Sequence, residues 1–240
     1  LAEQMPEWNR LACYMARGGF PLYDSTQAEY LATGEAYLND MLTVLDTAQR
    51  FIFVEYFIMA EGQIWDRLSE ILCRKSRQGV EVKLIFDDFG SMMRMPNEKV
   101  EELQDAGVEV KVFNPVHHYV NRLYFNYRDH RKITCVDGDV AYTGGANIAD
   151  EYANLIERFG YWKDCGVRLE GEGAWGLTRE FLQMWERMGG EAQHEYDYYR
   201  PLHHPAAQGF CQTVVDGPDD NPNNAAEDLF LQLISRARHT

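Results

Sequence analysis

The chain has 240 residues, of which 45% are hydrophobic, so it can bury a full core as one domain or two small ones. Its 23 basic and 38 acidic residues give a net charge of −15, which repels nucleic acid and excludes it as a long-range partner. A phosphate-bearing ligand would therefore need a local cationic site. The five cysteines form no CxxC pair, which excludes a disulfide framework and a zinc knuckle and favours a reducing compartment: Cys13, Cys73, Cys135, Cys165 and Cys211.

The first half of the chain alternates between helical and strand patterns. Residues 3–16 predict a short helix, and apolar residues at helical spacing predict another over 33–50, which leads into a β-rich run at 51–58. Two further pairs of helix and strand follow: 63–78 with 80–86, and 98–106 with 108–113. This alternation predicts a layered α/β fold, with a mixed, largely parallel sheet flanked by helices.

The second half changes character. Two short β runs within 130–143 flank Asp137-Gly138-Asp139, a strong signal for a hairpin turn. A strand at 165–170 and a long helix at 174–188 complete the core pattern. Prolines and weak periodicity over 196–224 then predict a linker or crossing segment.

A last helix is predicted at 225–239, and it resembles the one at 33–50. Aligning Ala48 with Ala237 matches four apolar positions in each: Met41, Leu42, Val44 and Leu45 with Phe230, Leu231, Leu233 and Ile234. The match predicts an internal repeat, of which this sequence holds one copy and the opening helix of the next. The predicted domains are an N-terminal helical segment, a first repeat, a linker and a truncated second repeat: 1–22, 23–195, 196–224 and 225–240.

No stretch approaches the roughly 20 apolar residues that a membrane-spanning helix needs, and no signal peptide is evident. The sequence begins at Leu1 rather than at a methionine. Whether the protein has a membrane anchor outside these residues therefore stays open.

The candidate site lies in the predicted hairpin. Residues two apart on a strand share a face, so His130 and Lys132 project together while Arg131 points away. A turn at 138–139 places Asn147 opposite His130, and a turn one residue earlier shifts the pairing by two positions. In either register Asn147 returns close to His130 and Lys132. We therefore expect an imidazole, an ammonium and a carboxamide to converge on one small volume.

Such a trio suits chemistry at phosphorus. Imidazole can attack phosphorus, or protonate a leaving oxygen, near neutral pH. An ammonium and an amide donor stabilise the charge on a five-coordinate phosphorus. Gly144 and Gly145 allow the backbone to approach a ligand closely. Asn147 also suits the N-cap of a helix at 148–152, whose N-terminus would attract anions.

Basic residues gather beside this trio. Between residues 117 and 132, four basic residues stand against one acidic residue, a net charge of +3 within a chain of −15: Arg122, Arg128, Arg131 and Lys132 against Asp129. This patch is a candidate for the local cationic site that a phosphate ligand requires.

Together these residues resemble the signature of the phospholipase D superfamily: His130-x-Lys132-x4-Asp137 followed by Gly144-Gly145-x-Asn147. The flanking segments resemble those of bacterial cardiolipin synthases: Glu55-Tyr56, Asp87-Asp88-Phe89-Gly90, Asn126-x-Arg128, Asn147 to Tyr152 and Tyr161 to Asp164. The resemblance extends from residue 23 to the C-terminus. It implies a phospholipase D-like layered fold in which the first repeat is the catalytic domain.

In that superfamily, two such motifs meet at one active site. The resemblance implies that one histidine forms a phosphohistidine, that the other protonates the departing alcohol, and that His130 is one of the two. Lys132 and Asn147 would hold the phosphate. Asp164 would hydrogen-bond the far nitrogen of His130, and Asp137 would be a structural member of the motif. Further candidate substrate contacts are Gly144, Gly145, Arg128 and Glu55.

The implied activity is phosphatidyl transfer of cardiolipin synthase type, which joins two phosphatidylglycerol molecules and releases glycerol without a cofactor or an obligatory metal. The implied partners are the glycerophospholipid, a membrane surface at the cytoplasmic face of the cell membrane, and a second HxKxxxxD half. That half would come from further chain or from homodimerisation, because the other histidines lack a lysine two residues later: His117, His118, His194, His203, His204 and His239.

Two rival functions stay open, namely a homodimeric phosphodiesterase or nuclease of the same superfamily and a noncatalytic half-module. The other motifs give weaker evidence of a function. The run from Gly171 to Gly176 matches GxGxxG, but no ribose-binding acid follows, so we expect no nucleotide site. The pairs His117-His118 and His203-His204 lack partners at metal-ligand spacing, so we expect no metal site. Asp87-Asp88 ends a strand and suits either a functional site or a helix cap.

Overall fold

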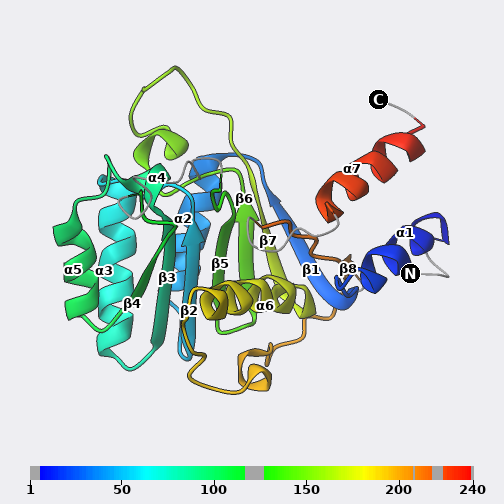
Figure 1. Ribbon diagram of the computed structural model, residues 1–240, viewed down its shortest axis with the longest axis horizontal. Coiled ribbons are helices and arrows are strands. Elements are labelled where there is room, and N and C mark those ends of the chain that lie inside the picture. Colours follow the sequence, from blue (N-terminus) through cyan, green and yellow to red (C-terminus); the bar gives the residue numbers. More distant parts are fainter. Residues whose placement is uncertain (1–5, 117–126, 208, 218–223, 239–240) are drawn as a thin grey trace.

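The computed structural model describes residues 6–116, 127–207, 209–217 and 224–238. Within these ranges one eight-stranded mixed sheet forms the centre of the molecule, with the strand order β4-β3-β2-β5-β6-β7-β1-β8 (Figure 1). The strands are β1 (Tyr23–Leu31), β2 (Phe51–Tyr56), β3 (Glu81–Asp87), β4 (Glu109–Phe113), β5 (Lys132–Val136), β6 (Val140–Gly144), β7 (Gly166–Gly171) and β8 (Gly209–Cys211).

Helices cover both faces of this sheet (Figure 1). α2, α3 and α5 lie over one face and α6 crosses the other, while α1 and α7 lie near the β8 edge. The helices are α1 (Pro6–Arg17), α2 (Gly34–Leu45), α3 (Gln63–Arg77), α4 (Asp88–Ser91), α5 (Asn97–Asp105), α6 (Glu172–Arg187) and α7 (Ala225–Arg236), with the 3-10 turns η2 (Asp150–Ala153) and η3 (Tyr196–Tyr199).

A hydrophobic core lies on each side of the sheet, because successive residues of a strand face opposite ways. Phe51 and Phe53 of β2 face α6, where Phe53 stacks on Phe181 with the ring centroids 4.7 Å apart. Ile52 and Val54 face the other side, against α2 and α3. Burial on both faces explains why β2 begins with four consecutive apolar residues, Phe51 to Val54, rather than alternating apolar and polar ones.

The predicted α/β fold with flanking helices is confirmed, but the sheet is mainly antiparallel rather than largely parallel. Parallel pairing joins only β2 to β3 and β3 to β4, which are connected through α3 and α5. The five other pairings in the sheet are antiparallel. Three antiparallel pairings already outnumber the two parallel ones without β1, because β5 runs antiparallel to β2, β6 to β5 and β7 to β6. The polar, mostly exposed strand β1, which the sequence pattern does not predict, adds two more antiparallel pairings.

The segment predicted as a linker, 196–224, contributes to this fold. Tyr199 of η3 is fully buried, and its ring packs on Phe51 with the centroids 5.1 Å apart. β8 extends the sheet by pairing with β1. α7 differs, because none of its residues is buried and it contacts α1. The domain boundaries and the truncated second repeat stay predictions.

The strands bring several distant segments to one edge of the sheet. Because β2 and β5 are antiparallel, Tyr56 at the end of β2 lies opposite Lys132 at the start of β5. In the same way, Gly144 at the end of β6 lies opposite Gly166 at the start of β7. The end of β3 reaches this edge too, since β3 runs parallel to β2. Strand ends of this kind are where open α/β sheets bind ligands.

Candidate active site

His130 and Lys132 form the centre of the candidate site. The Nζ of Lys132 lies 3.1 Å from Nδ1 of His130 and donates a hydrogen bond to the His130 carbonyl oxygen at 2.6 Å. Lys132 is 4% exposed, whereas His130 is exposed. Arg131 points to the opposite face, where its Nη2 lies 2.8 Å from Oε1 of Glu55. The two motif side chains therefore share a face as predicted, and Arg131 points away.

The observed hairpin register lies between the two predicted ones. Ile133 pairs with Thr143 and Val136 pairs with Val140. The turn between the strands contains three residues, and its first two have positive φ angles, 56° at Asp137 and 77° for the glycine that follows. Asparagine, aspartate and glycine tolerate that conformation best, which explains the Asp-Gly sequence.

The electrostatics of the pair favour an uncharged imidazole beside a charged ammonium. Burial lowers the pKa of Lys132 to about 8, although the carboxylates of Asp129 and Asp164 oppose the shift. Partial desolvation and the neighbouring Lys132 charge lower the pKa of His130. At neutral pH the imidazole is therefore mostly neutral and the ammonium mostly charged. A histidine nucleophile beside a phosphate-binding cation needs these two states.

Phe57 is a site residue that sequence reasoning missed. Its ring lies against the His130 ring, with the centroids 4.8 Å apart, and 5.6 Å from the Lys132 Nζ. It is held from behind by Gly90, where an added Cβ would lie 2.2 Å from the Phe57 carbonyl oxygen. The only signal in the sequence is the position of Phe57 directly after β2.

Asn147 lies at the same edge, but its side chain is engaged elsewhere. Its Oδ1 accepts a hydrogen bond from the backbone N–H of Ile58 at 3.0 Å, and its Nδ2 donates one to the Tyr152 hydroxyl at 2.8 Å. It does not cap the following turn, because the N-cap of η2 is Ala149. Asn147 thus ties the loop after β2 to the loop after β6. To hold a phosphate, its amide would have to release one of these bonds.

Gly144 and Gly145 are required for chain packing. A Cβ at Gly144 would lie 2.6 Å from the carbonyl oxygen of Cys165. A Cβ at Gly145 would lie 2.3 Å from Oδ1 of Asp164. Both glycines therefore let β6 approach the residues before β7, which brings the Asp164 carboxylate into the field of Lys132.

Asp164 accepts a hydrogen bond from the Cys165 N–H at 2.9 Å. Among the described residues no hydrogen bond joins it to His130, whose Nδ1 faces Lys132. Its role in orienting the imidazole therefore stays a prediction.

Asp137 lies at the far end of the hairpin from His130. Its carboxylate accepts hydrogen bonds from three backbone N–H groups, of Gln49 at 2.8 Å, Arg50 at 2.7 Å and Phe51 at 2.9 Å. It lies five positions along the strand from Lys132, roughly 16 Å at about 3.3 Å per residue. Asp137 therefore fixes the entry into β2 and touches no group of the candidate site.

Arg128 and Asp87 anchor the segment before β5. Nη1 of Arg128 lies 3.3 Å from Oδ1 of Asp87 and donates to the Asn114 carbonyl oxygen at 2.9 Å. Asp87 caps α4 by accepting from the N–H of Phe89, and its other oxygen accepts from the N–H of Asp129 at 3.0 Å. Of the two uses left open for this acidic pair, the helix cap is therefore the one observed.

Glu55 is buried on the face of the sheet away from Lys132. It is 0% exposed, and its carboxylate lies within ion-pair distance of Arg131 but at angles that make no hydrogen bond. Burial raises the pKa of Glu55, and the Arg131 charge opposes that shift. Arg131 is shared with Asp129, whose Oδ1 accepts from its Nε at 2.9 Å. The expected contact of Glu55 with substrate is not supported by this placement.

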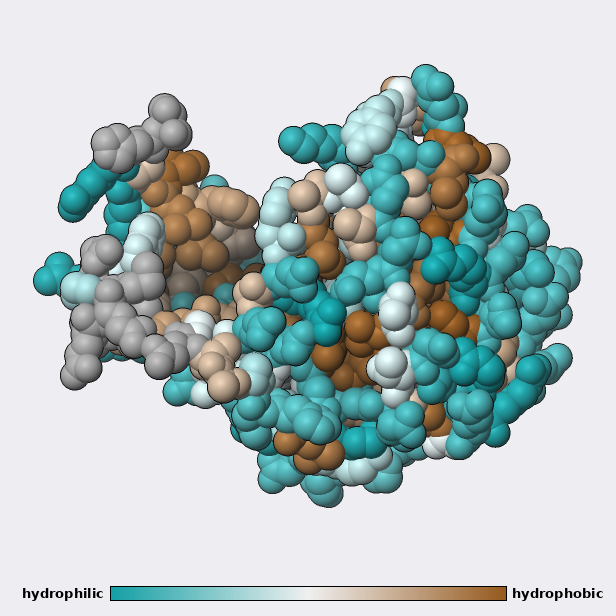
Figure 2. Space-filling view, turned by 180° about the vertical axis from the view of Figure 1, so that it is seen from behind, coloured by the Kyte–Doolittle hydropathy of each residue, from teal (hydrophilic) through white to brown (hydrophobic). Residues whose placement is uncertain are grey.

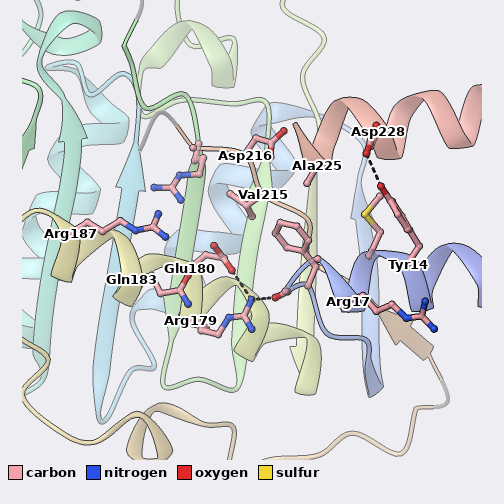
Figure 3. Close-up of a pocket in the computed structure, with 16 residues that line it drawn as sticks. Tyr14, Arg17, Arg179, Glu180, Gln183, Arg187, Val215, Asp216, Ala225 and Asp228 are labelled. Carbon is pink, nitrogen blue, oxygen red and sulfur yellow. Dashed lines mark hydrogen bonds and ion pairs between the residues drawn. The ribbon is translucent and has the colours of Figure 1, made fainter. Parts of the chain in front are cut away.

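A cavity of about 740 Å³ lies beside this network, between α1, α6 and the segment before α7 (Figure 3). Arg179, Glu180, Gln183 and Arg187 point into it from α6 (Figure 3). Arg131 contributes to its wall, whereas His130 and Lys132 do not. The cavity mixes basic and acidic side chains and is separate from the His130–Lys132 pair.

The remaining motifs have structural uses. Gly173 and Gly176, within the GxGxxG run, pack so closely that an added Cβ would lie 2.5 Å and 2.4 Å from Thr26 and Thr213 side-chain atoms. His203 pairs with Asp139 at 2.8 Å on the surface. In the described part of the chain, no group of three or more His, Cys, Asp or Glu residues could hold a metal ion. Several residues weighed from the sequence lie outside the described ranges: His117, His118, Arg122 and Asn126.

Comparison with known proteins identifies the family. The family model described as "Cardiolipin synthase, PLD-like domain" matches residues 41–185, more than half of the chain. This chain belongs to that phospholipase D-like family. None of the described helices is long and apolar enough to cross a membrane.

Individual relatives agree with this assignment. A cardiolipin synthase of Geobacillus kaustophilus is 35% identical over 224 residues, which cover 93% of this chain and 44% of the relative. A protein of Streptococcus mutans without an assigned function is 39% identical over 239 residues, 99% of this chain and 51% of that protein. The structure of phosphatidylserine synthase from Haemophilus influenzae superposes with a TM-score of 0.53 at 14% identity, covering 78% of this chain and 45% of that one, and shows a shared fold. The chain thus spans about half the length of the curated relatives it matches.

Proposed function

We propose that this chain supplies one half of the active site of a phosphatidyltransferase of cardiolipin synthase type, with two phosphatidylglycerol molecules as substrates and cardiolipin and glycerol as products. The observation that supports it most directly is the His130 imidazole 3.1 Å from a buried Lys132 ammonium at the edge of the sheet where several strands end. Family membership supplies the reaction class.

The reaction proceeds in two displacements at phosphorus. A histidine nitrogen attacks the phosphorus of the donor lipid, and the bond from phosphorus to the oxygen of the headgroup glycerol breaks. A second histidine gives that oxygen a proton, and glycerol leaves. The second histidine then takes the proton of the acceptor's headgroup hydroxyl. The resulting oxygen attacks phosphorus and the bond from phosphorus to nitrogen breaks. His130 fills one of the two histidine roles.

In this scheme the Lys132 ammonium bonds first to His130 and then to the substrate phosphate. While its ammonium donates to Nδ1 of His130, a neutral imidazole carries its proton on Nε2 and cannot attack through that atom. An arriving phosphate oxygen is an anionic acceptor and competes for the ammonium. When the Lys132 ammonium turns from Nδ1 to the phosphate, the imidazole can take the tautomer with its proton on Nδ1. Nε2 then has a free lone pair and becomes the nucleophile. Substrate binding would thus activate His130.

The second half of the site must contribute the other histidine. The related cardiolipin synthase is more than twice as long as the region it shares with this chain, which leaves room for a second copy of the motif in such a protein. A second copy of this chain is the other candidate source. We further propose that the enzyme works at the cytoplasmic face of the cell membrane, where its lipid substrates lie.

The test measures cardiolipin formation from phosphatidylglycerol by the complete native protein. We expect His130→Ala to lower the rate by at least about a thousandfold, because it removes either the nucleophile or the general acid. The matched control is His203→Ala, since His203 is 86% exposed and bonded to Asp139 on the surface. Absence of cardiolipin from the wild type, or full activity in His130→Ala, would refute the proposal.

A further inference from the structure

Two loops at the edge that holds His130 expose many large apolar side chains, which we call the apolar rim. One loop follows β3 and the other follows η2, and the labelled α4 marks the first of them at the upper left of Figure 1. Met93 is 91% exposed and Phe159 is 78% exposed. The full rim is Phe89, Met92, Met93, Leu155, Ile156, Phe159 and Tyr161. So dense a set of exposed apolar residues marks an interaction surface.

The two loops form one surface because they are bonded to the same carboxylate. Arg94 from the first loop lies 2.7 Å from Oε1 of Glu151, and Arg158 from the second lies 3.0 Å from it. Glu151 is 1% exposed, so the carboxylate that joins the two loops is buried. The backbone N–H of Glu61 also donates to the Arg94 carbonyl oxygen at 2.9 Å. The relative position of the loops is therefore fixed by the fold.

The rim also frames the candidate active site. On one side, α4 packs through Gly90 against Phe57, whose ring lies 4.8 Å from that of His130. On the other side, Trp162 packs edge-on to Tyr152 with the centroids 4.7 Å apart, and Tyr152 bonds Asn147. A surface that binds the rim therefore lies on the same side of the molecule as the exposed His130.

Charge distinguishes the rim from the rest of the chain. Residues 89–96 and 154–163 contain Arg94, Arg158 and Lys163 against Glu157, and both arginines pair with the buried Glu151. With Glu151 counted, this region carries a net charge of +1 within a chain of −15, so an anionic surface repels it less than it repels the rest of the chain. Aromatic and methionine side chains beside arginine and lysine have the composition of protein segments that enter the headgroup layer of a bilayer.

We propose that the apolar rim docks the protein on an anionic phospholipid bilayer, with its side chains at headgroup depth and the exposed His130 facing the layer of phosphodiesters. The choice of lipid rests on the proposed function, whereas docking itself requires no turnover. A lipid phosphodiester would then reach His130 without leaving the bilayer.

The experiment measures sedimentation of the protein with vesicles of phosphatidylglycerol and phosphatidylcholine, compared with phosphatidylcholine alone. We expect Met93→Asp and Phe159→Asp each to weaken binding to the anionic vesicles by about tenfold, because each places a charge where an apolar side chain enters the interface. Both residues are so exposed that the folded state should be unaffected, which circular dichroism checks.

The matched controls are Ile234→Asp on α7 and Tyr30→Asp on β1, at residues 71% and 64% exposed. Apolar residues also gather on α7, at the upper left of Figure 2, so α7 is the strongest rival surface. The controls should bind vesicles like the wild type. Loss of binding in the α7 variant with full binding by the rim variants would overturn the proposal, and so would a wild type that binds no vesicles.

Further measurements separate this proposal from the proposed function. The rim variants should still bind tungstate, a phosphate mimic, as the wild type does, while His130→Ala should lose it and still bind vesicles. Tungstate binding that is independent of His130 would count against the proposed function alone. A change of oligomeric state in the rim variants, measured by light scattering, would show a contact between protein copies and would overturn the docking proposal.

Discussion

Lys132 and His130 illustrate how one residue sets the charge state of another. Each has a lowered pKa, mainly because burial or partial desolvation disfavours its charged form, and the Lys132 charge lowers the pKa of His130 further. The lysine pKa of about 8 is close to the working pH of a cell, so its protonation is open to experiment. Neutral His130 and charged Lys132 coexist only between their two pKa values.

The rate of phosphatidyl transfer should therefore depend on pH as a bell. If His130 is the nucleophile, the acidic limb lies below the usual histidine range, and the alkaline limb falls near pH 8 as Lys132 loses its proton. Lys132→Arg should lower the maximum rate but extend activity to higher pH, because a guanidinium stays protonated there. The measurement is kcat/KM against pH for both proteins. If the alkaline limb has the same position in Lys132→Arg as in the wild type, a group other than Lys132 causes it.

Glu55 provides a second test at this scale, of stability rather than activity. Removing one partner of a buried ion pair is costly, so Glu55→Gln should destabilise the fold by about 3 kcal/mol even though Arg131 keeps Asp129. Urea unfolding measures this. The control is Asp46→Asn, which removes an exposed ion pair with Arg74 and should change stability by less than about 1 kcal/mol. Equal losses of stability in the two variants would show that the buried Glu55 pair stabilises the fold no more than the exposed Asp46 pair.

At the scale of elements, the β5–β6 hairpin performs two tasks at opposite ends. Its open end presents Lys132 beside His130, and its turn presents Asp137 to the amides at the start of β2. The turn locks β2 beside β5, and that pairing sets the position of Phe57 under the imidazole. The HxKxxxxD motif thus spans the two residues before β5 that include His130, the whole of β5, and the first residue of its turn.

Asp137→Ala should separate the structural task from the catalytic one. The change removes three hydrogen bonds to a charged acceptor and puts alanine at a φ of 56°, so we expect a loss of about 3 kcal/mol of stability. At temperatures where the variant stays folded, kcat/KM should remain within about twofold of the wild type. Denaturant unfolding and steady-state kinetics measure the two effects. A large loss of kcat/KM in folded protein would contradict this division.

At the scale of the whole molecule, distinct surfaces are arranged around one sheet. The edge with His130 carries the apolar rim, the α6 face carries the charged cavity, and α7 presents apolar side chains beyond the β8 edge. α7 buries none of its residues within the described chain, so its apolar side chains stay exposed and could pack against another element. Under the proposed function, a second histidine would approach the His130 edge from outside this sheet.

The sequence by itself determined the parts that depend on local spacing. His130 and Lys132 share a face because they are two residues apart on a strand, and Arg131 faces away for the same reason. Helical and strand periodicity predicted most elements of the α/β fold, since burial on one side leaves a repeat in the chain.

Only the tertiary structure decided which distant groups meet. It directed the Asn147 amide to Ile58 and Tyr152, buried Glu55 on the opposite face, and made most strand pairings antiparallel. Phe57 entered the site for the same reason, because Gly90 packs against it from another strand end. The physical cause is that a side chain's orientation follows from local backbone geometry, whereas its partners come from segments far away in the chain, whose pairing no local pattern specifies.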